Sequence, residues 1–129
     1  MTAGPVVCNS SPLIALDQIG RLDILTQLFG TVLAPPAVVR ETSPPTILPG
    51  WITEQAPTQP IGSQILRASL GPGEREAISL LEVSAAWTVL DDRPARRLAQ
   101  ALGLPVIGTP GILLAGKRRG FPAGRQALC

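Results

Sequence analysis

The most informative segment of the chain is WTVLDDRPARR, residues 87–97. It begins with an apolar run, Trp87–Leu90, continues with two adjacent acids, Asp91 and Asp92, and ends in a helix-like basic stretch. This order predicts a buried parallel strand that leads, at its carboxyl end, into a crossover helix. Because ligands of open α/β sheets bind at that edge, the two acids are the first candidates for a functional site. Aspartate is also a common helix N-cap, and that interpretation stays open for both.

Alternation of strand-like and helix-like patterns continues along the chain. Further strands are predicted at residues 5–8, 31–34, 51–53 and 104–107. Helices are predicted from Ser10 or Ser11 to Gly20 and at residues 21–29, 37–41, 64–68, 74–84 and 112–119, with turns at 70–73 and 108–111. Residues 43–60 hold five prolines and are predicted to be a long connection with an edge strand. The alternation predicts an α/β fold with a mostly parallel sheet, and 129 residues are enough for a single domain, 1–129.

The composition excludes several kinds of chemistry. There is no histidine, so Ser-His-Asp catalysis and histidine metal sites are excluded. The two cysteines, Cys8 and Cys129, form no framework and are expected to be reduced thiols in a cytoplasm. No apolar run is long enough to span a membrane, and the N-terminus lacks the basic region of a signal peptide. Because the chain has no histidine and only two cysteines, any acid–base or metal chemistry must depend mostly on carboxylates.

Charge is distributed unevenly along the chain. The part up to Asp92 carries a net charge of −5, whereas the part from Arg93 onward has no acid and carries +7. This arrangement can attract both a divalent cation and a polyanion, but solvated helix faces explain it equally well. The candidate nucleic-acid contacts are Arg93, Arg96, Arg97, Lys117, Arg118 and Arg119.

Oxygen-bearing side chains follow three of the predicted strands. Asn9, the Asp91–Asp92 pair and Thr109 each come after a strand, and parallel strands bring such residues to one edge of the sheet. Glu41 and Glu74 lie on helices that are expected to lean over this edge, and Ser10 and Ser11 add hydroxyl groups. Such a set suits Mg²⁺ or Mn²⁺. The alternatives are an ordinary exposed Glu41 and a Glu74 favoured only by the helix dipole.

Four motifs together resemble the PIN-like domains: VVCNSSPLIAL, PPAVVRE, GPGEREAI and VLDDRPARRLAQALGLPVIGTPGILLAGKRRG. The resemblance is to a poorly characterised prokaryotic branch with Asn-x-Ser-Pro-Leu-Ile near its start, related to VapC-type toxins, and it extends to about Gly120. It implies a Rossmann-like, three-layer α/β/α sandwich. In active members it implies a ribonuclease that depends on Mg²⁺ or Mn²⁺. Many relatives are toxins of toxin–antitoxin pairs, often homodimers inhibited by a small antitoxin protein.

Carried over by this resemblance, the first family acid falls at Asn9 and the second at Glu41. The acid after the third major strand matches Asp92, with Asp91 as the alternative, and Glu74 resembles an additional acid. Where the last family acid is expected, the chain has Thr109. Asn9 supplies an oxygen without charge and Thr109 only a hydroxyl, so this site should bind Mg²⁺ more weakly than a full set of acids. The resemblance also implies a further helix beyond the basic one, which this chain is expected to lack, and the exposed apolar face would favour dimerisation or instability.

Two hypotheses for function follow. The first is a PIN-type endoribonuclease, the toxin of a toxin–antitoxin pair, with Asp92, Asp91 and Glu41 as catalytic residues and a divalent cation that activates water. The second is a catalytically inert PIN-like module that binds nucleic acid or a protein partner, and the missing first and last acids favour it. A small-molecule α/β enzyme has little support, because the chain has neither a glycine-rich fingerprint nor a histidine.

Overall fold

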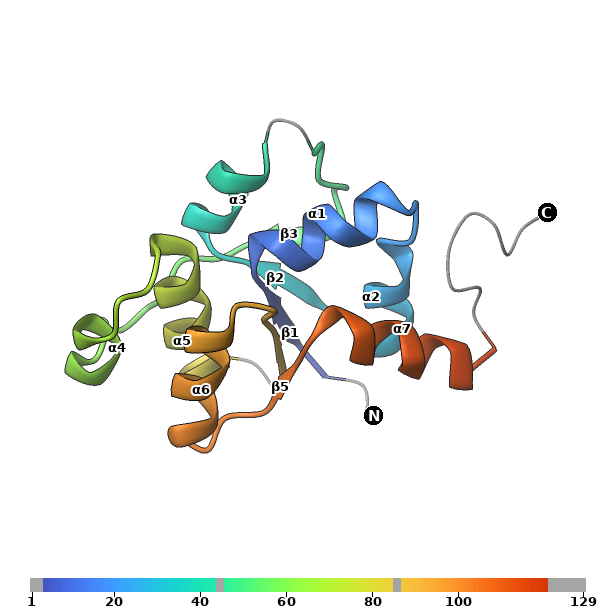
Figure 1. Ribbon diagram of the computed structural model, residues 1–129. Helices are drawn as coiled ribbons and strands as arrows, with labels where there is room; N and C mark the ends of the chain where they lie inside the picture. Colours follow the sequence, from blue (N-terminus) through green and yellow to red (C-terminus); the bar gives the residue numbers. More distant parts are fainter. Residues whose placement is uncertain (1–3, 44–45, 85–86, 121–129) are drawn as a thin grey trace.

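The computed structural model describes residues 4–43, 46–84 and 87–120. Within these residues the core is a five-stranded, all-parallel sheet in the order β3-β2-β1-β4-β5, with helices on both faces (Figure 1). The strands are β1 (Val6–Cys8), β2 (Val32–Ala34), β3 (Ile52–Glu54), β4 (Trp87–Val89) and β5 (Val106–Ile107). The helices are α1 (Ser10–Gln18), α2 (Asp23–Phe29), α3 (Pro36–Thr42), α4 (Ser63–Arg67), α5 (Pro72–Ser84), α6 (Arg93–Ala101) and α7 (Thr109–Arg118).

The central strand β1 is apolar throughout because it is covered on both faces. Val6 and Cys8 pack into the cluster formed with α1, α2 and α7, whereas Val7 packs with Leu33 and Ala77 on the face that α5 covers. Burial raises the pKa of the Cys8 thiol far above its ordinary value, so Cys8 is an inert core residue. The predicted three-layer α/β/α sandwich is therefore confirmed. None of the helices in the described ranges has the length and hydropathy of a membrane span.

Two predicted turns are instead the first turns of helices. Helix α5 begins at Pro72 rather than Glu74, and α7 begins at Thr109 rather than Ile112. Proline is well suited to the first turn, where its missing N–H would have no partner inside the helix. As a result Gly73 is a buried helical residue, although the Pro-Gly pattern predicted a turn at this point.

The direction in which successive strands are added to the sheet reverses between β1 and β4. It runs from β1 through β2 to the edge strand β3 and then crosses to β4 and β5 on the other side of β1 (Figure 1). Asn9 directly follows β1, and Asp91 comes two residues after β4. The carboxyl ends of these adjacent strands flank the topological switch point, where open α/β sheets bind their ligands. The fold thus brings Asn9 and Asp91 to the edge that the sequence predicted.

Candidate metal centre

Asn9 occupies the centre of this edge, and its side chain is buried. Asn9 is the N-cap of α1, which begins at Ser10, the first of the two predicted starts, yet its side chain caps no N–H of that helix. Only 1% of Asn9 is exposed, and Oδ1 has no hydrogen-bond partner among the described residues. An unsatisfied buried oxygen costs about 1–3 kcal/mol. Asn9 Oδ1 is therefore a candidate ligand atom, since a cation or water would remove that cost.

Glu41 lies beside Asn9, and both side chains meet at Gly73. Ser10 Oγ, at the start of α1, donates a hydrogen bond to Glu41 Oε1 at 3.2 Å. A Cβ atom at Gly73 would clash with Glu41 Oε1 and would lie 3.1 Å from Asn9 Oδ1. Three helices, α1, α3 and α5, thus bring an amide oxygen and a carboxylate together over a bare Cα atom. Glycine leaves that space open, whereas the Cβ atom of any other residue would enter the space that the two oxygens share.

Asp91 is held by the first residue of α7. Its Oδ1 accepts the backbone N–H of Thr109 at 2.7 Å, and its Oδ2 accepts the Thr109 hydroxyl at 2.5 Å. The carboxylate therefore satisfies an N–H group at the start of α7 and is fixed in orientation. Each carboxylate oxygen has further acceptor capacity, so these two bonds leave Asp91 able to bind a cation. Thr109 thus acts here as a hydrogen-bond partner of Asp91.

Asp92, preferred over Asp91 on the sequence, is the N-cap of α6. Its Oδ2 accepts the N–H of Ala95 at 3.1 Å, a standard N-cap bond, and the side chain is exposed. Glu74 is half-buried, and its carboxylate lies close to Gly71 just before α5. In the described ranges no three acidic or cysteine side chains are gathered closely enough to hold a metal ion. The available donors are therefore the amide oxygen of Asn9 and separate carboxylates.

A comparison with protein families decides the identity of the fold. A family model described as a PIN domain matches residues 5–128, nearly the whole chain. This chain belongs to the PIN domain family. PIN domains form a nuclease family whose members generally depend on divalent metals and typically bind nucleic acid. No curated protein matches the chain. The resemblance inferred from the four motifs is thus confirmed at the level of the PIN domain.

The six predicted nucleic-acid contacts of this PIN domain fall into two groups, one on α6 and one at the end of α7. Arg93 and Arg97 are exposed on α6 next to the acidic pair, whereas Arg96 is half-buried and donates from Nη1 to the Leu90 carbonyl at 3.1 Å. Lys117–Arg119 are exposed at the C-terminal end of α7, and Lys117 lies roughly 12 Å along the helix axis from Thr109. Arg93 and Arg97 are therefore the exposed predicted phosphate contacts on the helix that follows the acids, whereas the guanidinium of Arg96 and the carboxylate of Asp91 both lie beside Gly108.

Two residues of this PIN domain were missed in the sequence. The sequence pattern predicts a turn at Gly73 and indicates no contact for Glu76. In the structure Glu76 Oε1 accepts the N–H of Ala37, at the start of α3, at 2.9 Å. One pattern in the sequence indicates the close approach of α3: Gly73 and Ala77 are small residues four positions apart, hence on one face of α5.

A separate hollow lies against α7 and differs in character from the Asn9–Glu41 site. It is lined by Ile107, Gly111, Leu114, Ala115, Arg118 and Arg119. Its lining has no carboxylate or amide side chain, so it offers no ligands for Mg²⁺ or Mn²⁺.

Proposed function

We propose that this PIN domain is an endoribonuclease that depends on Mg²⁺ or Mn²⁺. The main support is the buried, unpartnered Oδ1 of Asn9 beside the carboxylate of Glu41, at the centre of the edge where α/β folds bind ligands. Oxygen donors of this kind suit Mg²⁺ and Mn²⁺. Because Gly73 has no side chain, no atom of residue 73 stands between the two oxygens. The residues present therefore fit a divalent cation, with fewer charges than a fully acidic site would supply.

Asn9 and Glu41 would hold the cation, and Asp91 would join them from the adjacent strand β4. Asp92 and Glu74 remain predicted acids of the same edge. When bound, such a cation neutralises charge on a phosphate and lowers the pKa of water. The protein residues orient the substrate, and the bonds from Thr109 keep Asp91 fixed. In this proposal Asp91 and Asp92 both belong to the site: Asp91 is oriented by its two bonds from Thr109, and Asp92 caps α6 through one oxygen.

RNA would bind along the basic C-terminal part of the chain. Arg93 and Arg97 would contact phosphates next to the acids, with Arg96 more restricted by its bond to Leu90, and Lys117–Arg119 would extend the electropositive surface. The affinity should fall steeply as the salt concentration rises. The toxin role, with a small antitoxin protein, a homodimer and a cytoplasmic location, is part of the proposal and is supported by the family resemblance alone.

The double substitution Asp91→Asn with Asp92→Asn should reduce Mg²⁺-dependent RNA cleavage by roughly 100-fold or more. Asparagine is as good an N-cap as aspartate, and its oxygen can still accept the Thr109 N–H, so folding should be retained. Cleavage of a labelled RNA is measured with the unfolding midpoint of each variant. Glu54→Gln, an exposed acid on β3, is the matched control. Undiminished cleavage by the double variant would remove both acids from the active site.

The second candidate is an inert PIN module that binds nucleic acid. It is favoured by the engagement of both Asp91 and Asp92 with helix N-termini and by the neutral Asn9. Calorimetric titration separates the candidates: RNA binding without detectable Mg²⁺ or Mn²⁺ binding supports the inert module, whereas metal binding that Glu41→Gln weakens supports the nuclease.

A further inference from the structure

We infer that Glu76 is a positioning residue that fixes the carboxylate of Glu41 by holding the helix on which it lies. This inference rests on the proposed function, because it concerns how the metal site is kept in place. Glu76 would act only through α3, and its own carboxylate is engaged by the backbone of that helix.

Helix α3 lacks a cap of its own. It has seven residues, its N-cap is Pro35, and no side chain from the N-cap position bonds to its first turn. Pro36 has no N–H, and the N–H of the next residue, Ala37, is bound by Glu76 Oε1 at 2.9 Å. A carboxylate at a helix N-terminus is favoured both by the hydrogen bond and by the helix dipole. Glu76 thus serves as the N-cap of α3 from a different helix.

The other end of α3 also contacts α5. Gly73 lies three residues before Glu76 on α5 and meets Glu41, which lies four residues after Ala37 on α3. The start of α3 thus contacts the later residue of α5 and the end of α3 contacts the earlier one, so the two helices are antiparallel. The contacts are roughly 4.5 Å apart along α5 and 6 Å apart along α3, so the two spans nearly match. The hydrogen bond that Glu76 accepts from Ala37 therefore sets the axial position of α3. It thereby also sets the position of Glu41 relative to Asn9. Because a helix of seven residues is unstable alone, this external cap should be important for its order.

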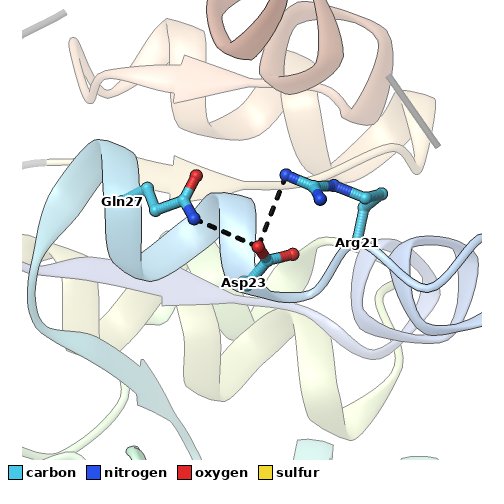
Figure 2. A network of polar contacts seen from close by, with 3 residues as sticks. All are labelled: Arg21, Asp23 and Gln27. Atoms are coloured by element: carbon cyan, nitrogen blue, oxygen red, sulfur yellow. Dashed lines mark hydrogen bonds and ion pairs between the residues drawn. The ribbon is translucent and has the colours of Figure 1, made fainter. Parts of the chain in front are cut away.

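The experiment compares Glu76→Ala with Glu76→Gln, whose side-chain oxygen can still accept the Ala37 N–H. The matched control is Asp23→Ala at the start of α2, which also has seven residues. Asp23 accepts a hydrogen bond from Gln27 at 3.1 Å and pairs with Arg21 at 3.4 Å (Figure 2). Its removal should loosen a short helix remote from the metal site. Amide hydrogen exchange reports the order of each helix, and calorimetric titration with MnCl₂ alone reports the metal affinity.

In Glu76→Ala, exchange of the α3 amides should rise about fivefold, and Mn²⁺ affinity should fall about tenfold. Glu76→Gln should keep the wild-type affinity, and Asp23→Ala should alter α2 exchange alone. If Glu76→Ala does not fold, Glu76→Asp replaces it, since the shorter side chain draws the carboxylate away from Ala37.

Unchanged α3 exchange overturns the capping role. Faster α3 exchange with unchanged Mn²⁺ affinity overturns the positioning role. A wild-type chain that binds no Mn²⁺ overturns the proposed function and any role toward a metal, while the exchange data still test whether Glu76 caps α3.

Discussion

Gly73→Ala should fold as stably as the wild type and yet lose metal-dependent RNA cleavage by roughly 100-fold. The new Cβ would clash with Glu41 Oε1, the far end of a flexible side chain that can swing away at little cost. Alanine also favours a helix by up to about 1 kcal/mol over glycine, so α5 should gain stability. The same Cβ would lie 3.1 Å from Asn9 Oδ1 and would cover that oxygen. Activity and stability should therefore change independently.

This variant is measured by thermal unfolding and by the rate of RNA cleavage at saturating Mg²⁺. Gly50→Ala is the matched control, because a Cβ there would meet no atom within 4 Å. Glu41→Gln is the positive reference and should lose a similar amount of activity. Full cleavage by Gly73→Ala, together with an unchanged Mg²⁺ requirement, would show that the Glu41–Asn9 pair is not the metal site.

Asn9→Asp should bind Mn²⁺ about tenfold more tightly than the wild type, because it adds a negative charge among the donors. Without metal the same substitution should lower the free energy of unfolding by about 3 kcal/mol, since it places an uncompensated carboxylate in a buried position beside Glu41. Added Mn²⁺ binds the folded chain and should restore that loss progressively with concentration.

Urea unfolding in EDTA and in MnCl₂, together with calorimetry, measures both effects. Asn9→Ala is the control, because it removes the unpartnered oxygen and adds no charge. It should weaken Mn²⁺ binding without the large loss of stability in EDTA. An Asn9→Asp variant whose stability does not respond to Mn²⁺ would contradict the assignment of Asn9 as a ligand.

The position of the site could be predicted from the sequence because it follows from the strands. Short apolar runs ending in Asn9, in Asp91–Asp92 and in Thr109 predict parallel strands with polar residues at one edge, and the structure places these residues there. The strand order adds what the sequence did not specify: the switch point lies between β1 and β4, with Asn9 and Asp91 on its two sides.

The contacts within the site could not be predicted, because they depend on how helices pack. The Pro-Gly pattern before Glu74 is typical of a turn, and only the approach of α3 explains a buried helical Gly73. Similarly, the sequence does not reveal that Asp91 bonds Thr109 whereas Asp92 caps α6, since two adjacent acids after a strand suit either role. The hydrogen bond that Ala37 N–H donates to Glu76 joins residues 39 positions apart, and no local sequence pattern predicts it.

In our proposal Asn9 and Glu41 form the core of one divalent cation site at the carboxyl edge of the sheet. Crystals soaked in MnCl₂ test it most directly, because manganese gives an anomalous difference signal. We predict a peak between Asn9 Oδ1 and the Glu41 carboxylate that is lost in Glu41→Gln. A map at saturating Mn²⁺ with no peak there, or with a peak only elsewhere on the molecule, would contradict the account.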